Sequence, residues 1–524
     1  MCGIVGYIGQ RKAYPILIKG LKRLEYRGYD SAGVALISDN RQLNVYKAKG
    51  KVSELETFVA QKDISGSIGI AHTRWATHGE PCSVNAHPHY SSSERLALIH
   101  NGIIENYAVL KEKLQAKGYV FKSSTDTEVL VQLIEYIQVT NHIDLLTAVQ
   151  LALQEVIGAY AIAVLDKDNP DGIIAARKSS PLVVGIGEGE FFLASDATPI
   201  VEYTDKVVYL EDEEIALIRR GEKLKVVNLK NVECPHEVKT VALNLGQLEK
   251  GGYPHFMLKE IFEQPGCIHD CMRGRINVEG TNVVLSAVID YKKRLLAAKR
   301  FVIVACGTSW HAALIGKHLI ESFCRIPVEV EYASEFRYRD PILNENTLMI
   351  IISQSGETSD TLAALKLAKS RGVPVLAIVN VVGSSIARAA DYVMYTYAGP
   401  EIAVASTKAY MVQMCVLYLF ALRLAYARGR LSEAETRRFT AQLLRAPEVI
   451  KPRLADCEQI KYLASRYVNT QSCFFIGRGF DYALSLEGSL KLKEISYVHS
   501  DAYAAGELKH GTISLITDGV PVIA

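Results

Sequence analysis

The stretch Phe301-Val302-Ile303-Val304-Ala305-Cys306-Gly307-Thr308-Ser309 decides the fold of the second half of this 524-residue chain. Its five apolar residues predict a buried strand, and the glycine and hydroxyl residues that follow predict a turn into a helix expected over 314–323. Strands and helices continue to alternate on the carboxyl side, at 328–332, 348–352, 362–370 and 375–379. This alternation predicts a doubly wound α/β domain built on a parallel sheet.

A weaker copy of the same pattern recurs further along the chain. Phe301 aligns with Cys473, and Leu348 aligns with Val520, at one shared offset (473 − 301 = 520 − 348 = 172). The repeat predicts a second α/β domain with a parallel sheet, in which 520–524 is a core strand. Because such a strand needs a covering helix and sheet neighbours, we expect the natural protein to continue beyond residue 524.

The first 240 residues follow a different pattern. Short β-rich runs alternate with Gly-rich turns, and helices are expected near 107–117 and 126–137, which predicts an antiparallel α+β layered domain. A polar connector containing Gly251-Gly252-Tyr253-Pro254 follows. We therefore expect domains at 1–240, 266–435 and 436–524, with the connector at 241–265.

Composition excludes several classes of protein. A formal charge of +2 gives no basis for binding nucleic acid, and no uninterrupted apolar run approaches the roughly 18 residues of a membrane span. The N-terminus has no export signal, so we expect a cytoplasmic protein with reduced thiols. Cys267 and Cys271 flank His269 but lack a second ligand pair, so neither a metal site nor a cofactor is expected.

Cys2 follows the initiator methionine directly. Removal of that methionine leaves a cysteine with a free α-amino group. An α-amine titrates near pH 7.7–8.0 and can activate the adjacent thiol without a separate histidine. Alone, this N-terminal sequence is weak support, because a small buried strand residue is the simpler explanation of it.

Five further segments, at 27–33, 72–79, 85–89, 100–106 and 124–128, resemble the N-terminal-nucleophile (class II) glutamine amidotransferases in order and spacing. Glutamine presents a carboxylate, an ammonium and a scissile amide, and each needs its own partner. By this resemblance Arg74 binds the carboxylate with its planar fork, Asp126 binds the ammonium, and Asn101 with the Gly102 N–H forms an oxyanion hole.

The resemblance also implies that the pocket for glutamine is lined by Thr77, His78 and His87, and that Trp75 gates a path for ammonia. Simpler interpretations remain open at this point. Arg74 and Asp126 would serve equally in exposed ion pairs, His87 as a structural hydrogen-bonding residue, and Trp75 as a core aromatic residue.

Two loops of the second half carry small hydroxyl residues at the ends of predicted strands, at 306–309 and 353–358. The carboxyl ends of parallel strands are where ligands bind, and exposed N–H groups at a helix start suit a phosphate dianion. Ordinary helix caps would show the same residues.

The second half resembles the sugar isomerase domain, present twice, and the whole chain is similar to the glucosamine-6-phosphate synthase family. That family converts fructose-6-phosphate and glutamine to glucosamine-6-phosphate and glutamate. The resemblance implies that the phosphate is held by Ser309, Ser353, Gln354, Ser355 and Thr358. It also implies that the binding site of the sugar is lined by Cys306, Thr308, Val404 and Ser406.

The segment 486–497 matches the catalytic helix of that family. Lys491 and Glu494 are three residues apart and share a helix face, and two interpretations remain open: a plain surface ion pair and a catalytic pair. In the latter case Glu494 moves the proton between C1 and C2 of the sugar. By resemblance His510 opens the sugar ring from the partner subunit of a homodimer. A tail lysine that forms a Schiff base in the family has no counterpart here, so we expect this chain to make little hexosamine phosphate.

Two rival functions share parts of this pattern. An amidotransferase acting on phosphoribosyl pyrophosphate would need an acidic, Gly-Thr-bearing loop after a strand, and the sequence has none. A sugar-phosphate-sensing regulator would carry a helix-turn-helix in front, where this chain has the amidotransferase segments. Both are therefore disfavoured.

Overall fold

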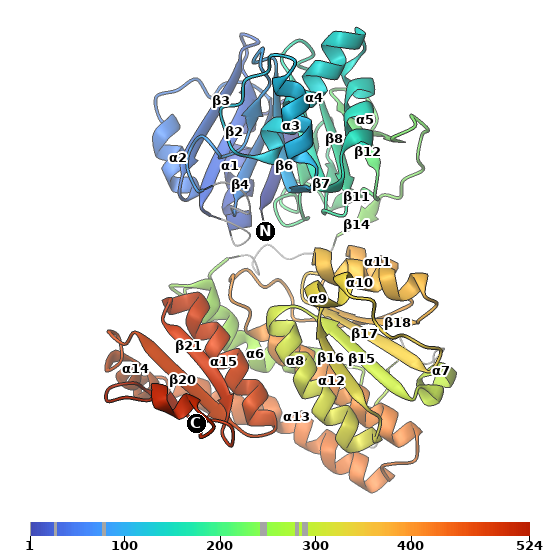
Figure 1. Cartoon of the computed structure of the whole chain (residues 1–524), viewed down its shortest axis with the longest axis vertical. Coiled ribbons are helices and arrows are strands. Elements are labelled where there is room, and N and C mark those ends of the chain that lie inside the picture. The colour runs from blue at the N-terminus through green and yellow to red at the C-terminus, as the bar shows by residue number, and fades with distance from the viewer. Residues whose placement is uncertain (1, 26–28, 76–79, 242–248, 278–281, 286–291) are drawn as a thin grey trace. The chain divides into compact units, whose positions relative to one another are not determined.

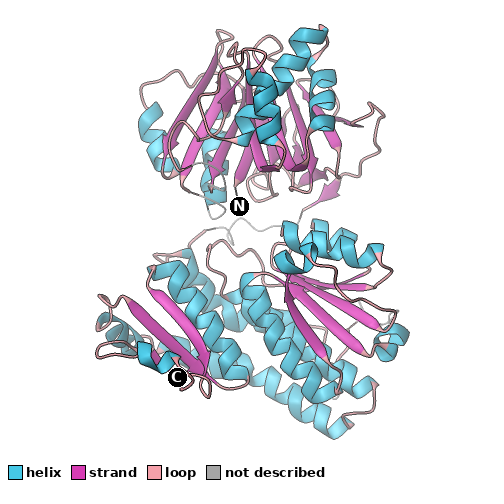
Figure 2. Cartoon of the chain, viewed as in Figure 1, coloured by secondary structure: helices cyan, strands magenta, loops and turns pink. Residues whose placement is uncertain are grey.

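The computed structural model describes residues 2–25, 29–75, 80–241, 249–277, 282–285 and 292–524. The chain divides into two compact units, Met1–Leu248 and Glu249–Ala524 (Figure 1). The first is dominated by strands and the second by alternating strands and helices (Figure 2).

The N-terminal unit contains two sheets with helices on their outer faces. The first sheet has the order β14-β11-β9-β10-β1-β4-β2-β3. Its strands are β1 (Gly3–Ile8), β2 (Ser31–Ile37), β3 (Leu43–Lys49), β4 (Ile68–Arg74), β9 (Val183–Ile186), β10 (Phe191–Ala194), β11 (Lys206–Tyr209) and β14 (Lys239–Thr240). It is covered by α1 (Ala13–Leu24) and α2 (Val52–Val59).

The second sheet has the order β13-β12-β8-β7-β6-β5, and all its neighbours are antiparallel. Its strands are β5 (His89–Tyr90), β6 (Leu96–Ile104), β7 (Gly158–Asp166), β8 (Gly172–Lys178), β12 (Glu214–Arg219) and β13 (Lys225–Asn228). The helices α3 (Tyr107–Gln115), α4 (Asp126–Asn141) and α5 (Leu145–Glu155) pack against it. The predicted α+β layered domain is thus confirmed.

Successive side chains along each strand point to opposite faces of the sheet, so they belong to different layers of the unit. In β1, Ile4 and Ile8 enter the core between the sheets, whereas Val5 and Tyr7 pack against α1. Strands β6 and β7 alternate in the same way between the inter-sheet core and the helices α3 to α5. Side chains that alternate across a strand let both faces of each sheet be buried.

The C-terminal unit begins with a five-stranded parallel sheet of order β16-β15-β17-β18-β19. Its strands are β15 (Arg300–Ala305), β16 (Val328–Tyr332), β17 (Thr347–Ser353), β18 (Val375–Val379) and β19 (Tyr392–Tyr395). One face packs on α6 (Phe256–Met272), α7 (Lys292–Ala297), α8 (Gly307–Cys324) and α12 (Lys408–Ala427). The other packs on α9 (Ala333–Tyr338), α10 (Ser359–Ser370) and α11 (Ser385–Ala389), so the doubly wound prediction is confirmed.

A second parallel sheet has the order β21-β20-β22, with β20 (Ser472–Gly477), β21 (His499–Ala504) and β22 (Val522–Ile523). Helix α15 (Phe480–Ser496) follows β20, and a 3-10 turn spans Thr512–Leu515. The first strand again lies between the second and the third, as in β16-β15-β17. This shared order supports the predicted repeat.

The register of that repeat differs from the prediction by one residue. Phe301 lies opposite Leu348, but Phe474 lies opposite Val522 and not opposite Pro521, as a constant offset of 172 would require. The predicted core strand at 520–524 is also shorter and more exposed than expected. Val522 and Ile523 are 39% and 49% exposed because no described element covers them.

Two predicted boundaries fall inside helices. Helix α6 begins at Phe256, within the predicted connector 241–265, and Pro265 lies inside it. The predicted boundary after residue 435 lies in the first turn of α13 (Glu433–Ala455), where Ser432 and Glu435 form a capping box. Helix α14 (Glu458–Ser465) then leads to β20. The predicted boundaries thus differ from the ends of these helices by a helix turn or more.

Helix α12 is long and apolar enough to cross a membrane by length and composition, with a mean hydropathy of 1.5 in its most apolar window. The polar residues Gln413 and Arg423 interrupt its sequence, so it contains no uninterrupted apolar run as long as a membrane span. Of that window, 72% is buried within the unit, against α6 and α8. This burial is typical of a core helix.

Four buried histidines lie where the two sheets of the N-terminal unit meet: His72, His87, His89 and His100. The rings of His72 and His87 are 4.2 Å apart, and those of His87 and His89 are 5.0 Å apart. Burial lowers the pKa of all four below the usual value, and it lowers the pKa of His72 to about 3. The folded unit therefore keeps these rings neutral.

We predict that the N-terminal unit loses stability as the pH falls from 6.5 towards 3. The unfolded chain then binds protons that the folded chain cannot, and each such histidine costs about 1.4 kcal/mol per pH unit well below pH 6.5. Replacing His89 with Gln should remove about 1 kcal/mol of the loss between pH 6 and pH 5.

Urea denaturation, followed by the fluorescence of Trp75, gives the free energy of unfolding at each pH. A Trp310→Phe background leaves Trp75 as the one tryptophan of the chain. The same variant at pH 8 is the control, because the histidine is then neutral in both states. Identical losses of stability with and without His89→Gln would contradict the prediction.

Candidate active sites

Cys2 lies immediately before β1, in the middle of the first sheet. Its sulfur accepts a hydrogen bond from the Trp75 backbone N–H at 3.3 Å and is 3.6 Å from the Trp75 carbonyl oxygen. Burial raises the pKa of the Cys2 thiol, and the Trp75 N–H opposes this by stabilising the thiolate. The thiol is therefore fixed at the end of a central strand.

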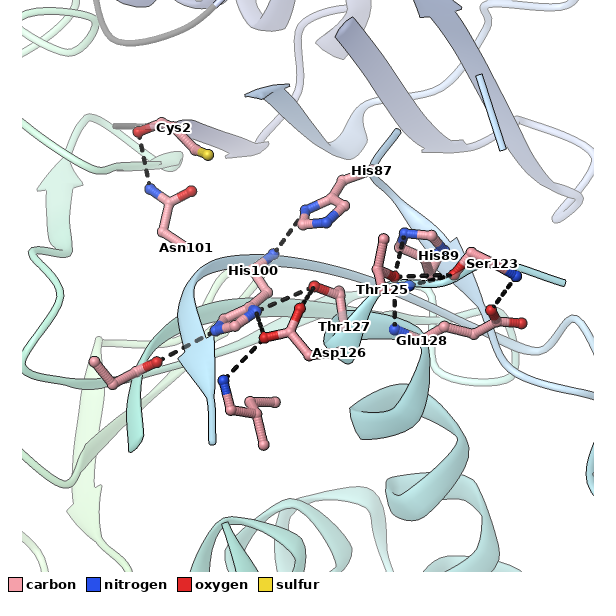
Figure 3. Close-up of polar contacts among 12 residues, drawn as sticks. Cys2, His87, His89, His100, Asn101, Ser123, Thr125, Asp126, Thr127 and Glu128 are labelled. Carbon is pink, nitrogen blue, oxygen red and sulfur yellow. Dashed lines mark hydrogen bonds and ion pairs between the residues drawn. The ribbon is translucent and has the colours of Figure 1, made fainter. Parts of the chain in front are cut away.

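The predicted oxyanion hole lies beside Cys2. Asn101 in β6 is 8% exposed, and its side-chain Nδ2 donates to the Cys2 carbonyl oxygen at 3.1 Å (Figure 3). The next residue, Gly102, has a φ of +134°, and a Cβ there would lie 2.0 Å from the Ala159 carbonyl oxygen. Only glycine fits this position, because a side chain would collide with the Ala159 backbone. Gly102 itself is exposed.

Arg74 and Asp126 are both buried, so the interpretation of two exposed ion-pair residues is wrong. Arg74 ends β4, the strand that pairs with β1 beside Cys2. Asp126 begins α4, and its Oδ2 accepts the Ile104 N–H at 2.9 Å and lies 3.9 Å from His100 Nδ1 (Figure 3). Arg74 thus lies on the strand next to β1, and Asp126 contacts β6, the strand that carries Asn101.

The remaining predicted residues of this site differ in their surroundings. His87 stacks on His72, and its Nδ1 accepts the His100 N–H at 3.4 Å, so its contacts are those of a structural hydrogen-bonding residue. Trp75 is 47% exposed and meets Tyr29 edge-on at 5.4 Å, which excludes a core aromatic. Thr77 and His78 lie outside the described residues.

The predicted phosphate loop after β17 is a tight turn closed by its own hydroxyl groups. Ser353 Oγ accepts the Gly356 N–H at 3.0 Å and bonds Thr358 at 3.0 Å, and Ser355 Oγ accepts the Glu357 N–H at 3.1 Å. At Gly356 a Cβ would lie 2.0 Å from Ser384 Oγ. Gln354 lies in the same turn. The loop is therefore shaped before any ligand binds.

The loop after β15 lies next to it, because β15 and β17 are parallel neighbours. It consists of Cys306 and leads directly into α8, whose first turn carries Thr308 and Ser309. Ser309 Oγ accepts a bond from Gln413 Nε2 at 3.0 Å inside the unit. Cys306 is partly buried, which raises the pKa of its thiol. Both predicted phosphate and sugar loops thus meet at one edge of the sheet.

Glu487 in α15 joins this edge to the second sheet. Its carboxylate accepts from Thr308 Oγ1 at 3.0 Å and lies 2.6 Å from His311 Nδ1. Lys491 is 3.4 Å from Glu487, 3.1 Å from Thr308 and 2.5 Å from Glu494. The predicted pair of Lys491 and Glu494 therefore exists as an ion pair, and its lysine also reaches the sugar loop.

Sequence reasoning missed Glu487 and His311. Two signals were present: Glu487 is four residues before Lys491 on the same helix face, and His311 lies one helix turn after Thr308. Their contact spans 176 residues and follows from no local pattern.

Val404 and Ser406 lie on the loop between β19 and α12. Val404 is 62% exposed, and Ser406 Oγ donates to Glu401 at 2.7 Å. Glu260 of α6 holds the same loop by accepting the Ile402 N–H at 2.5 Å, and burial raises the pKa of Glu260 to about 7. His510 is exposed in a turn after β21.

Among the described residues, no group of three His, Cys, Asp or Glu side chains is arranged to hold a metal ion. Cys267 is partly buried and donates to the Ala398 carbonyl, Cys271 is buried, and His269 faces solvent. The three side chains therefore lie in different surroundings, although they belong to one helix.

Comparisons with known proteins match both units. The SIS domain family matches residues 294–423 and 467–524, and the glutamine amidotransferase domain family matches residues 72–202. Among solved structures, the C-terminal domain of glucosamine-fructose-6-phosphate aminotransferase from Francisella tularensis superposes with a TM-score of 0.51 and 38% identity. That match covers 52% of this chain and 77% of the other.

Two relatives match over the full length of this chain. The isomerizing glutamine–fructose-6-phosphate aminotransferase of Bacteroides thetaiotaomicron is 73% identical over 523 residues. That of Caldanaerobacter subterraneus subsp. tengcongensis is 52% identical over 524 residues. Each match covers 100% of this chain and 85% of the relative. With this identity across both units, the chain belongs to the family of isomerizing glutamine–fructose-6-phosphate aminotransferases.

Proposed function

We propose that this protein converts fructose-6-phosphate and glutamine to glucosamine-6-phosphate and glutamate, the first step of amino-sugar synthesis. The observation that carries the proposal is the position of Cys2. The residue precedes a central strand, its sulfur accepts the Trp75 N–H, and the Asn101 amide donates to its carbonyl group. A nucleophile and an amide donor are thus fixed side by side in a member of this family.

Glutamine hydrolysis uses the Cys2 thiol as the nucleophile. Its α-amine takes the thiol proton, and the sulfur adds to the side-chain amide of glutamine while Asn101 Nδ2 and the Gly102 N–H stabilise the oxyanion. The C–N bond then breaks, the amine proton leaves with ammonia, and water hydrolyses the thioester to glutamate. Arg74 and Asp126 hold the carboxylate and ammonium of the substrate.

The ammonia adds to C2 of open-chain fructose-6-phosphate, and loss of water gives an imine. Glu494 then takes a proton from C1 and returns it to C2, while the proton of the C1 hydroxyl moves to the imine nitrogen, which yields the 2-amino aldose. Lys491, which contacts Glu494 and Thr308, keeps this carboxylate at the sugar loop. The turn at 353–358 and Ser309 hold the phosphate, and Cys306, Val404 and Ser406 line the sugar.

We further propose a cytoplasmic homodimer that binds neither nucleic acid nor membrane. Two observations support it. His510 is exposed, as a residue that serves the partner subunit must be, and the net charge of +2 offers nucleic acid no strong attraction.

We predict that Cys2→Ala abolishes glutamine hydrolysis and leaves sugar-phosphate binding intact, because the nucleophile and the sugar loops belong to separate units. Glutamate release measures the first property, and calorimetric titration with fructose-6-phosphate measures the second. Cys82→Ala, which changes another partly exposed cysteine of the same unit, is the matched control. Normal glutamate release by Cys2→Ala would refute the proposed nucleophile.

We predict that Arg74→Lys raises the KM for glutamine by about tenfold or more, because lysine keeps the charge but loses the planar two-pronged donor. The melting temperature should fall by only a few degrees. Steady-state glutamate release and thermal unfolding measure the two effects. An unchanged KM in a folded variant would show that Arg74 does not bind the substrate.

We predict that Ser353→Ala weakens binding of fructose-6-phosphate by about 10- to 100-fold, the cost of one lost hydrogen bond to a charged group. Calorimetric titration gives the affinity, and glutamate release in the same preparation should be unchanged. Ser370→Ala, a helix-end serine of the same unit that bonds only its own helix at Leu367, provides the comparison. Equal affinities for both variants would remove Ser353 from the phosphate site.

A further inference from the structure

His72 is a buried residue of β4 that begins the motif segment 72–79 but has no role in the proposed mechanism. It lies in the first sheet, opposite Ile4 of β1 and Gly33 of β2. Its ring nitrogen Nε2 reaches across to the second sheet, 3.1 Å from the His100 carbonyl oxygen and 2.9 Å from Asn101 Oδ1. His72 therefore touches the residue that forms the proposed oxyanion hole.

The contacts of His72 fix which atoms carry hydrogen. The His100 carbonyl oxygen can only accept, so Nε2 of His72 must be the donor. The Asn101 atom beside that N–H is then an acceptor, which makes it Oδ1. Independently, the Cys2 carbonyl oxygen needs a donor, and it receives Nδ2 of Asn101 at 3.1 Å. Two separate constraints thus give the Asn101 amide the same orientation.

The imidazole also keeps this role at any working pH. Burial lowers the pKa of His72 to about 3, and the neighbouring His87 and His100 rings are buried and have lowered pKa values as well. A neutral ring has one N–H, and here that hydrogen lies on Nε2. The donor towards Asn101 is therefore constant.

We propose that His72 is a positioning residue for glutamine hydrolysis: its Nε2–H holds the Asn101 carbonyl oxygen, so that the Asn101 NH2 group faces the oxyanion formed from the glutamine amide. The inference rests on the proposed function. Without this bond the Cys2 carbonyl alone orients the amide, which can then turn by half a rotation and present its oxygen to the oxyanion. Loss of one oxyanion donor lowers kcat by about 10²–10³-fold.

The test compares two variants of the full chain. His72→Phe keeps a planar ring of similar size against His87 but has no donor, and we expect kcat for glutamate release to fall about 10- to 100-fold. His72→Gln restores a donor on a flexible chain, and we expect it to lower kcat only about three- to tenfold. KM for glutamine should change less than about threefold in both, because the oxyanion contact exists only in the transition state.

A double-mutant cycle separates positioning from a general structural role. In an Asn101→Ala background, neither His72 variant should lower kcat further, because the group that His72 orients is absent. His89→Phe is the matched control: it changes an equally buried histidine that contacts Thr125 at 3.1 Å and has no bond to Asn101. We expect its kcat to stay within about threefold of the unmodified chain.

Each outcome decides the matter. Wild-type kcat in a folded His72→Phe variant, or a full additional loss in the Asn101→Ala background, overturns the positioning role. If His72→Phe does not fold, His72→Leu, which also lacks a donor, replaces it in the same comparison with His72→Gln and in the same cycle. Failure of the proposed function gives a different result, namely no glutamate release by the unmodified chain, or undiminished release by Cys2→Ala.

Discussion

The hydrogen bond from the Asn101 side chain to the Cys2 carbonyl is the interaction on which the N-terminal site depends. It joins the two sheets of the unit, since Cys2 precedes β1 and Asn101 belongs to β6. The bonds from His72 to His100 and Asn101 cross the same gap. The groups that we propose for glutamine hydrolysis thus lie on strands or directly beside them, where small displacements are opposed by packing on both faces of each sheet.

In the C-terminal unit a buried carboxylate, that of Glu487, joins the two sheets in a similar way. Glu487 is 5% exposed, and its carboxylate joins α15 of one sheet to Thr308 and His311 on α8 of the other. A buried carboxylate is costly unless its oxygens are paired, and here a histidine, a hydroxyl and Lys491 pair them. The arrangement brings Glu494, through Lys491, to the loop that follows β15.

Local pattern was sufficient for much of this architecture. The apolar runs that became β1, β15 and β17 predicted strands correctly, and the motif spacing predicted both enzyme units. Local pattern could not predict contacts between distant segments. Nothing near His311 indicates Glu487, and nothing near His72 indicates Asn101. The one-residue register difference at β22 has the same origin, because register depends on the partner strand and not on the strand alone. The end of the predicted connector at residue 265 was wrong because α6 already begins at Phe256.

The central position of β1 has a consequence for synthesis of the chain. The strand is flanked by β4 and β10, and the Ile4 N–H bonds Ser195 Oγ across 191 residues. At about 5–20 residues per second, a ribosome needs roughly 10–40 s to deliver β10 after β1 has emerged. Throughout that interval the first sheet is incomplete, and the residues ahead of Gly3 stay accessible to processing enzymes. The edge left open on β1 is also a hazard, because an unpaired apolar strand is a template for association with other nascent chains.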